Sequence, residues 1–261
     1  MALEKNMYRW LLRKKARKGF LGSCLTLGVQ VSYIDYESFS LLLRAFNFEV
    51  PDANLVPLSS HPHRASQGLI DETYLFKFLG FDYVLSLDCS DYEGADIIFD
   101  LNENIIPQQY RGAFDAVFDF GTSEHIFHVP NVLNNIHEFL KVDGYVVHAL
   151  PFNNFPDHGF YCFNPTFFWD YYHENNYSIE AIETFALGET LEDDWEFQRY
   201  QPGIYDAYSE STGSLLGPER QGVLCCALKE KKSTSGRIPQ QSVYKAGLWN
   251  GERESIRSLS S

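Results

Sequence analysis

Short apolar runs that each end in polar residues follow one another between Tyr83 and Pro151. They read YVLSLDCS, ADIIFDLN and FDAVFDFGTSEH, and a fourth run, DGYVVHAL, comes after an amphipathic segment. Strands buried on both faces of a parallel sheet give continuous apolar runs rather than alternating ones. Ligands bind beyond the carboxyl ends of such strands, so an acid placed there can contact a ligand. The pattern predicts an open α/β sheet with several carboxylates at one edge.

Helical periodicity separates these strands. Apolar residues in 129–141 fall on one stripe, with Pro130 near the start, and Asp71 and Asn164 stand where N-caps are expected. Helices are predicted at 36–46, 71–79, 129–141 and from Pro165 onward, and strands at 21–28, 83–87, 95–99, 113–118 and 145–150, followed by YSIEAIETFAL and GVLCCALKE. This alternation predicts a doubly wound, mostly parallel sheet of seven strands with helices on both faces.

Composition divides the chain into a basic start, a main domain and a polar tail. Residues 1–20 carry six bases between Arg9 and Lys18, and we expect a helix that packs Trp10 and Leu11 against the domain. A membrane-surface or nucleic-acid-binding helix is the alternative. The main domain is placed at 21–232, and its acidic, aromatic insertion at 188–221 suits either a lid or a subunit contact in a homo-oligomer. Residues 233–261 are expected to be an extended arm or disordered.

The charge and cysteine content narrow the class of partner. A formal net charge of −14, from 35 acids and 21 bases, argues against nucleic acid, because that binding rests on Lys and Arg neutralising phosphates. No apolar run approaches the roughly 20 residues of a membrane span. Five cysteines without metal-ligand spacing, and no secretory signal, fit a reducing cytoplasm. We therefore expect a cytoplasmic protein with a small-molecule partner.

A nucleoside-bearing cofactor needs three features from such a sheet. The backbone must approach it closely after the first strand, a carboxylate must bind the ribose hydroxyls, and a polar group must meet the adenine edge. Each candidate also has a purely structural interpretation, as a turn or a cap, but their order along the chain favours the cofactor. The candidates are Gly28 with Val29 and Gln30, then Asp88, then Asp100-Leu101-Asn102.

At these residues the chain resembles the core of the class I S-adenosylmethionine-dependent methyltransferases. The segment FDAVFDFGTSEHIFHVPNVLNNIHEFLKVDGYVVHALP resembles their fourth strand, the following loop and helix, and the turn into the fifth strand. LKVDG stands where the family has L-K-P-G-G, and Glu124-His125 matches its frequent E-H pair. Asp88-Cys89-Ser90 matches the ribose-binding acid and its small polar follower. The resemblance covers roughly residues 20 to 232, and the two late strands suit the family's sixth and antiparallel seventh.

The resemblance implies S-adenosylmethionine as cofactor and a Rossmann-like methyltransferase fold. Asp88 would hold the ribose, Asp100 to Asn102 would meet the adenine, and Asp119, Phe120 and Gly121 would line the cofactor next to the methyl group. Two features depart from the family. Gly28 stands alone in LGVQVSY in place of an acid and Gly-x-Gly-x-Gly, and about 60 residues separate it from Asp88 where about 20 are usual. Gln30 is expected to supply hydrogen bonds in place of the missing loop amides.

The segment after the fifth predicted strand, PFNNFPDHGFYCFNPTFFWDYY, concentrates polar and aromatic residues. Loops in this position line the ligand edge, and a histidine beside an acid is a suitable general base. His158 is the first candidate, with Asp157 orienting it, and His125 is the second; the alternative is that Asp157 and His158 only cap a turn. His128 and His137 are expected to point elsewhere, so no metal is expected.

Together these features predict a methyltransferase that acts on an O or N nucleophile of a small molecule, for which the resemblance suggests a saccharide or secondary metabolite. A non-catalytic binding or scaffold protein that retained the fold is the alternative. A nicotinamide dehydrogenase ranks last, because the same loop is poor in glycine and no Tyr-x-x-x-Lys pair is evident. A serine hydrolase lacks its Gly-x-Ser-x-Gly turn.

Overall fold

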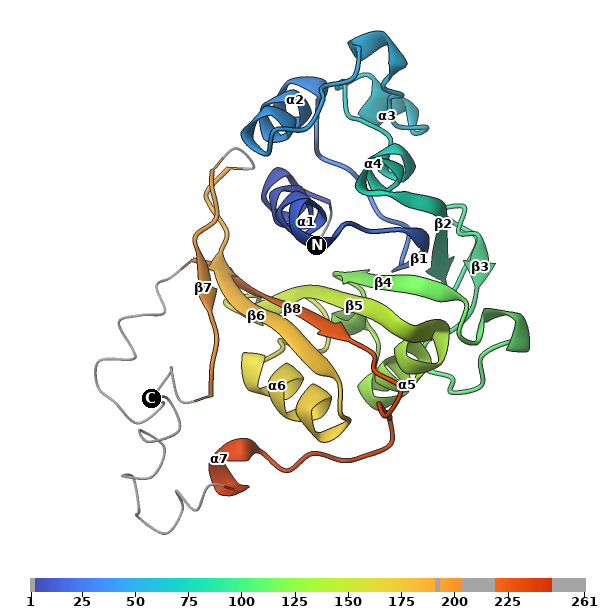
Figure 1. Cartoon of the computed structure of the whole chain (residues 1–261), viewed down its shortest axis with the longest axis vertical. Helices are drawn as coiled ribbons and strands as arrows, with labels where there is room; N and C mark the ends of the chain where they lie inside the picture. Colours follow the sequence, from blue (N-terminus) through green and yellow to red (C-terminus); the bar gives the residue numbers. More distant parts are fainter. Residues whose placement is uncertain (1–2, 191–192, 203–218, 246–261) are drawn as a thin grey trace.

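A single mixed sheet organises the chain, whose computed structural model describes residues 3–190, 193–202 and 219–245 (Figure 1). The strand order is β3-β2-β1-β4-β5-β8-β6-β7. The first five are parallel, whereas β8 runs antiparallel to both of its neighbours and β7 runs antiparallel to β6. The strands are β1 (Gly22–Leu27), β2 (Phe81–Asp88), β3 (Ile97–Ile98), β4 (Phe114–Phe120), β5 (Leu140–Asn153), β6 (Ser178–Ala186), β7 (Phe197–Arg199) and β8 (Gln221–Leu228).

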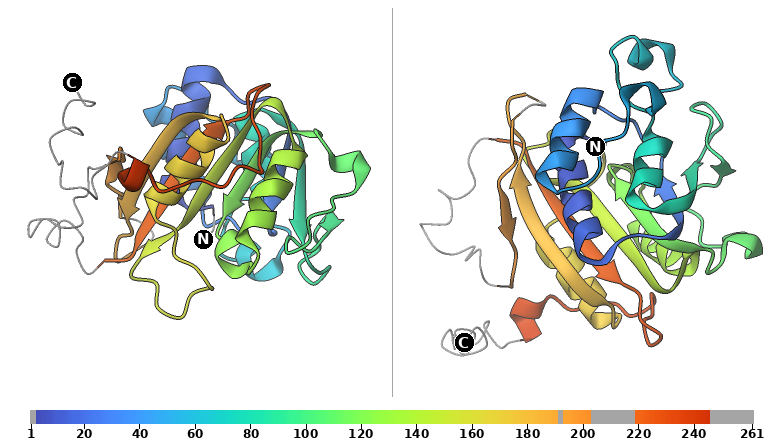
Figure 2. Two further views of the ribbon diagram at one scale, coloured as in Figure 1. Left: turned by 90° about the horizontal axis from the view of Figure 1, so that it is seen from below. Right: turned by 45° about the horizontal axis from the view of Figure 1, so that its top comes forward.

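Helices cover both faces of this sheet (Figures 1 and 2). On one face lie α1 (Lys5–Lys18), α2 (Tyr36–Ala45) and α4 (Glu72–Leu79), and on the other lie α5 (Val129–Phe139) and α6 (Pro165–Glu174). The short α3 (Pro62–Ala65) belongs to the connector before α4, and α7 (Ser242–Lys245) follows the last strand. The predicted caps are confirmed, since Asp71 accepts a hydrogen bond from the Tyr74 amide and Asn164 from the Thr166 amide. No helix in these ranges is both long and apolar enough to cross a membrane.

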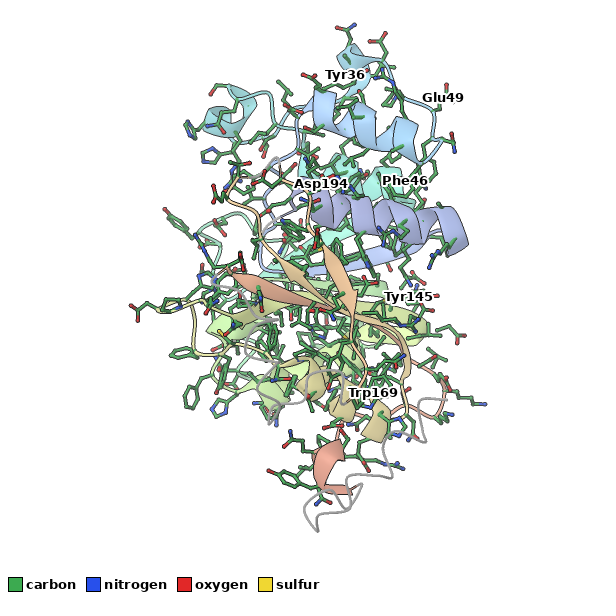
Figure 3. All side chains as sticks on the ribbon, turned by 90° about the vertical axis from the view of Figure 1, so that its left-hand side faces the viewer. Tyr36, Phe46, Glu49, Tyr145, Trp169 and Asp194 are labelled. Carbon is green, nitrogen blue, oxygen red and sulfur yellow. The ribbon has the colours of Figure 1, made fainter. Side chains whose placement is uncertain are left out.

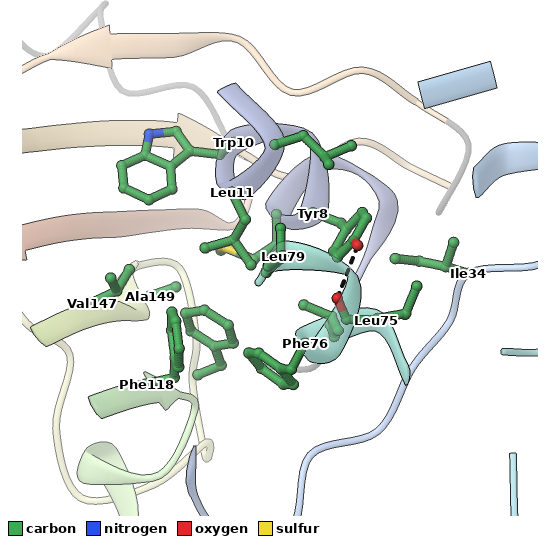
Figure 4. Packing of buried hydrophobic residues seen from close by; sticks show 14 of the residues in the cluster. Tyr8, Trp10, Leu11, Ile34, Leu75, Phe76, Leu79, Phe118, Val147 and Ala149 are labelled. Atoms are coloured by element: carbon green, nitrogen blue, oxygen red, sulfur yellow. Dashed lines mark hydrogen bonds between the residues drawn. The ribbon is translucent and has the colours of Figure 1, made fainter. Parts of the chain in front are cut away.

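Two hydrophobic cores, one on each face, hold the layers together. In the first, Leu11 of α1 and Phe76 of α4 pack against Phe118 of β4 and Val147 of β5 (Figure 4). Tyr8 is buried in the same core, and its hydroxyl donates to the Leu75 carbonyl at 3.0 Å. The second core joins α5 and α6 to the opposite face of the same strands. The central strands β1, β4, β5 and β8 contribute side chains to both cores, so they are buried on both faces.

The N-terminal helix is an integral layer of the fold. Trp10 and Leu11 are buried as expected, and Met7, Tyr8 and Leu12 are buried with them. The Trp10 indole N–H donates to Glu183 of β6 at 2.8 Å, and Lys14 pairs with Glu180 of the same strand. Residues 1–20 therefore belong to the same core as the domain that was predicted to begin at residue 21.

The sheet has eight described strands where seven were predicted. The additional strand, β7, comes from the acidic insertion, much of which lies outside the described residues. Its described part packs on the fold: Trp195 stacks on Phe185 with ring centroids 4.3 Å apart, and Asp194 forms ion pairs with Lys5 and Arg9 beside α1 (Figure 3).

The described part of the C-terminal arm lies along α6. The Thr234 amide donates to the Asn175 carbonyl at 2.9 Å, and the Ser242 amide donates to the Asp170 carboxylate at 3.0 Å. An arm draped on the domain, one of the two alternatives, is thus observed up to residue 245, and the remainder lies outside the described residues.

Candidate active site

The order of the strands fixes where a ligand can bind. From β1 the chain passes to β2 over the face that carries α2 and α4, and from β4 it passes to β5 over the face that carries α5 (Figure 1). Connections that leave adjacent strands in opposite directions open a crevice at the strands' carboxyl ends. In this sheet the point where the connections diverge lies between the ends of β1 and β4.

Backbone hydrogen bonds bring the predicted cofactor residues to this edge. The Gly28 amide donates to the Leu87 carbonyl at 2.7 Å, and the Phe99 amide donates to the Asp88 carbonyl at 2.8 Å. These bonds continue the parallel ladder past the strand ends. Gly28, Asp88 and the loop that begins at Asp100 are therefore side by side at the carboxyl edge.

The loop after β1 requires glycine at position 28. Gly28 has φ +73°, and a Cβ there would lie 2.8 Å from the hydroxyl oxygen of Thr122, which donates to the Leu27 carbonyl at 2.6 Å. Gln30 is buried next to this turn and donates from Nε2 to the same carbonyl at 3.0 Å. Its Oε1 is buried and has no hydrogen-bond partner among the described residues. Gln30 therefore presents an acceptor beside the glycine turn, whereas the loop amides that it was expected to replace are donors. Val29 between Gly28 and Gln30 is half-buried.

The acid at the end of β2 is half-buried, and its followers are exposed. Asp88 Oδ1 accepts a hydrogen bond from the Ser90 amide at 3.2 Å, which fixes the carboxylate over the turn. A hydrogen bond to Asp88, with partial burial, raises the pKa of the Cys89 thiol. That thiol consequently stays protonated at neutral pH and serves as a donor to the acid.

Helix α5 holds the loop after β3 in place. Asp100 Oδ1 accepts from both the backbone and the side-chain amide of Asn102 at 2.9 Å, and Asn102 Oδ1 accepts from the His128 amide at 3.1 Å. Asn135 of α5 donates to the Leu101 carbonyl at 3.2 Å. The side chain of Leu101 is buried and that of Asp100 is exposed. A rigid loop with an exposed acid results, and the Asn102 side chain is already used within it.

Asp119 corrects the expectation that residues 119 to 121 line the cofactor. Its carboxylate has no exposed surface and accepts from His148 Nδ1 at 2.7 Å, from the Ser123 hydroxyl at 2.5 Å and from the amides of Thr122 and Ser123. Burial alone would raise the pKa of Asp119, but the hydrogen bonds and charge of His148 and Ser123 outweigh it and lower the pKa. The carboxylate holds the loop after β4 and has no exposed surface through which it could contact a ligand.

The neighbours of Asp119 complete this correction. Phe120 is buried in the core beneath α1, and only Gly121, with φ +90°, lies in the turn itself. On the opposite side of the imidazole, His148 Nε2 lies 2.6 Å from the hydroxyl of Tyr172, whose pKa burial raises far above its ordinary value. The chain Asp119–His148–Tyr172 was not predicted. The sequence feature that could have indicated it is a polar residue within each of two apolar runs, Asp119 and His148, at positions that pair in the register of β4 and β5.

The predicted catalytic histidines lie together around an acid. His158 Nε2 lies 3.5 Å and His125 Nε2 lies 3.9 Å from Oε1 of Glu124, and the two imidazole centroids are 5.1 Å apart. Glu124 has no exposed surface, whereas both imidazoles are partly exposed. Sequence reasoning noted Glu124 only as part of the E-H pair and did not list it as a site residue. The structure makes it the centre of the cluster.

The role predicted for Asp157 is not observed. Asp157 is exposed and adopts φ +57°, and among the described residues no ion pair or hydrogen bond joins it to His158. The acid beside His158 is Glu124, because the loop after β5 folds back onto the turn after β4. His128 and His137 lie apart from the cluster as expected, and His137 Nδ1 lies 2.7 Å from the Tyr177 hydroxyl.

Burial sets the protonation of the cluster. It raises the pKa of Glu124 to about 7, and the charge of Asp119 adds to this effect. It lowers the pKa of both His125 and His158. The imidazoles are therefore neutral at pH 7 and present lone pairs, as a proton acceptor or a metal ligand must.

Two cavities lie on another part of the molecule, beside β6. One, of about 210 Å³, is lined by Trp169 and Tyr177, and the other, of about 510 Å³, by Trp10 and Arg17. Both border β6 and neither includes a residue at the carboxyl end of β1, β2 or β4. We place the candidate site at the strand edge, since the convergent polar groups are there.

Similarity to known proteins is found among solved structures alone. No protein-family profile and no curated protein sequence matches the chain. Among solved structures, it is similar to an S-adenosylmethionine-dependent methyltransferase from Thermotoga maritima, with 11% identity, 85% of this chain and 89% of that one covered, and a TM-score of 0.39. It is also similar to the complex of the Haloferax volcanii Trm112 methyltransferase activator with a methyltransferase, with 10% identity, 85% of this chain and 90% of that one covered, and a TM-score of 0.45. A third similar structure is phosphoethanolamine N-methyltransferase 2 from Haemonchus contortus in complex with S-adenosyl-L-methionine, with 12% identity, 87% of this chain and 53% of that one covered, and a TM-score of 0.42.

These similarities are too low to transfer any residue role. The chain's own topology agrees with the sequence resemblance, which implied that the last strand inserts antiparallel: β8 lies between β5 and β6 and is antiparallel to both.

Proposed function

We propose that this chain is a class I S-adenosylmethionine-dependent methyltransferase that acts on an O or N nucleophile of a small molecule. One observation carries the proposal: the parallel register places the Gly28 turn, the Asp88 carboxylate and the loop at Asp100 side by side, at the edge where the strand order reverses. A cofactor that contains adenosine needs a close backbone, a ribose-binding acid and a polar adenine contact in that order.

Each residue has a role that follows from its chemistry. Asp88, a carboxylate fixed by the Ser90 amide, would accept hydrogen bonds from two ribose hydroxyls. The loop at Asp100 would contact the adenine. Gln30 Oε1, buried and unpartnered among the described residues, would accept from the ammonium group of the cofactor's amino-acid end.

S-adenosylmethionine supplies, when bound, a methyl group already activated on a sulfonium. The protein then has to align the acceptor, exclude water and receive a proton. His158 and His125 stand at the same edge with neutral imidazoles, so either can accept the proton of an O or N nucleophile.

Aromatic side chains beside the histidines indicate the kind of acceptor. Phe127 and Phe160 are exposed, and their rings meet edge to face with centroids 5.7 Å apart. They belong to the same two loops as His125 and His158. An exposed aromatic pair at such a site favours a ring-bearing acceptor with an apolar face, which includes both aromatic rings and sugars.

Calorimetry with S-adenosylhomocysteine tests the proposal. We expect one binding site in the wild type and at least a tenfold weaker affinity in Asp88→Ala, because charge-assisted hydrogen bonds contribute about 1.5–3 kcal/mol. Asp82→Ala is the matched control, since Asp82 is an exposed acid at the opposite end of the same strand. No binding by the wild type, or equal affinity in the two variants, would contradict the proposal.

A non-catalytic binding or scaffold protein is the second candidate. The observation in its favour is the first loop, where Gly28 is the only glycine and where Thr122 bridges the ends of β1 and β4. This candidate predicts a folded wild type that fails to bind S-adenosylhomocysteine. The same titration therefore decides between the two.

A further inference from the structure

The cluster of Glu124, His125 and His158 has the composition and spacing of a metal site. One carboxylate oxygen and two imidazole nitrogens all lie within 4.8 Å of one another. Donor atoms that bind one metal ion at about 2.0–2.2 Å are separated by about 3–3.5 Å. The 3.5 Å between His158 and Glu124 already meets this value, and the 3.9 Å between His125 and Glu124 needs a few tenths of an ångström.

The two loops that carry these residues are clamped together. The Phe160 amide donates to the Glu124 carbonyl at 2.6 Å, and the Tyr161 hydroxyl donates to the Phe127 carbonyl at 2.8 Å. Gly159, between His158 and Phe160, has φ +76° and lies so close that a Cβ would be 2.7 Å from the Glu124 carbonyl oxygen. The backbone therefore holds His158 against Glu124, and the cluster does not depend on the chance meeting of mobile side chains.

The charges around the cluster favour a cation. Glu124 has no exposed surface, and Asp119, an equally buried carboxylate, lies five residues before it at the end of β4. Placing two carboxylates in a dry interior is costly unless positive charge lies opposite them. His158 Nε2, for its part, is buried and has no hydrogen-bond partner among the described residues. A cation between the Glu124 carboxylate and the two imidazoles would give His158 Nε2 a partner.

We propose that Glu124, His125 and His158 bind one divalent transition-metal ion of the Zn²⁺, Mn²⁺, Fe²⁺ or Co²⁺ class. Two imidazoles and one carboxylate are typical ligands of these ions. Glu124 closes the inner side of the site, and the partly exposed imidazoles leave its outer side open. Three protein ligands with an open position are characteristic of a catalytic metal rather than a structural one.

The open position also bears on the acceptor. Phe127 and Phe160 are exposed and belong to the same two loops as His125 and His158, so a ligand that packs on this ring pair can place an oxygen on the ion. This step rests on the proposed function and favours an oxygen nucleophile over a nitrogen one. His125 and His158 would then act as ligands of the ion rather than as bases.

Calorimetry on the whole chain, after treatment with a chelator and under reducing conditions, tests the metal site with Zn²⁺ and Mn²⁺ as separate probes. Mn²⁺ is included because thiolates bind it poorly, so that the exposed Cys89 and Cys162 do not imitate the site. We expect one equivalent to bind to the wild type. His125→Ala and His158→Ala should each weaken binding by more than the roughly 10–100-fold that is typical of residues behind the ligands.

His128→Ala is the matched control, because His128 is an exposed histidine of the same segment outside the cluster. It should bind both ions as the wild type does. Glu124→Gln should also lose binding; if it does not fold, the two partly exposed histidines still decide the question. Failure of the wild type to bind either ion, or equal affinity in His125→Ala, His158→Ala and His128→Ala, would overturn the proposal.

The same proteins separate this proposal from the methyltransferase assignment. Asp88→Ala should lose S-adenosylhomocysteine and keep the metal ion, and His158→Ala should lose the metal ion and keep S-adenosylhomocysteine. A wild type that binds the ion but not S-adenosylhomocysteine would contradict the proposed function alone. One that binds S-adenosylhomocysteine but no ion would contradict the metal site alone.

Discussion

Removing the carboxylate of Asp119 should destabilise the fold more than any comparable change on the same strand. Asp119→Ala takes away the acceptor of four hydrogen bonds, from His148, from the Ser123 hydroxyl and from two backbone amides. All of these donors are partly or fully buried, so water cannot readily replace the lost acceptor. The variant also leaves a cavity between β4 and β5.

The magnitude follows from burial. Taking one partner from a buried, hydrogen-bonded pair typically costs about 3–5 kcal/mol, whereas a partly exposed pair contributes about 1 kcal/mol. Asp115 supplies the comparison, because it lies on the same strand and accepts from Lys141 at 2.8 Å while its side chain remains 27% exposed. We expect Asp119→Ala to lower the free energy of unfolding by about 3–5 kcal/mol and Asp115→Ala by about 1–2 kcal/mol.

Urea unfolding followed by far-UV circular dichroism measures both variants. The change should appear as a lower midpoint at an unchanged slope, since the surface exposed on unfolding stays the same. Asp119→Asn, which preserves the volume, separates the loss of charge from the cavity and remains measurable if Asp119→Ala does not fold. Equal midpoints for Asp119→Ala and Asp115→Ala would refute the argument that the buried network stabilises β4 and β5.

Two further changes test the histidines and the clamp between the loops. Burial, and secondarily the charge of Lys229, lower the pKa of His137 to about 4, while Glu138 acts in the opposite direction. In the unfolded chain His137 takes up its proton near pH 6.5. The stability contributed by neutral His137 is therefore present above about pH 6.5 and is lost as the pH falls toward about 4. His137→Gln, which keeps an acceptor for Tyr177, should therefore show a smaller loss of urea midpoint between pH 7 and pH 5 than the wild type, and an equal loss would count against this assignment. Gly159→Ala should lower the thermal midpoint and weaken Zn²⁺ binding at least tenfold, whereas Gly94→Ala, at the same φ of +76° with no atom within 4 Å, should affect only stability; equal Zn²⁺ affinities in the two variants would show that the clamp does not position His158.

Local patterns predicted the framework well where one segment determines its own structure. The caps at Asp71 and Asn164 depend only on the next three residues, and both were identified correctly. The carboxyl edge was also predicted, since any parallel sheet brings its strand ends together. The eighth strand, β7, was not predicted, because three residues in an acidic segment carry no apolar periodicity and pair with β6 only in the folded chain.

The candidate site was predicted in part. Asp119 was assigned to a ligand because it stands near the end of an apolar run, but β4 continues to Phe120 and the strand's alternation turns Asp119 toward His148. A shift of one position exchanges the two faces of a strand, and the length of a strand cannot be read to that accuracy from a single sequence. Glu124 gained its place from the loop after β5, which lies more than 30 residues further along the chain.

The arrangement of buried charge argues for a functional site over a scaffold. The end of β4 and the turn that follows it place Asp119 and Glu124 in the interior, and a hydrogen-bond network that joins β4, β5 and α6 compensates the charge of Asp119. A protein selected only for its fold would gain stability from an apolar side chain at position 124, because a buried carboxylate is costly there. Instead the loop after β5 has a glycine at position 159, where a Cβ would clash with the Glu124 carbonyl oxygen, and His158 Nε2 lies 3.5 Å from the Glu124 carboxylate. A loss of stability of this kind is typical of a site that must hold a ligand. The hydrogen bonds of Asp119 fix the turn after β4, so that Glu124 is preorganised to bind that ligand.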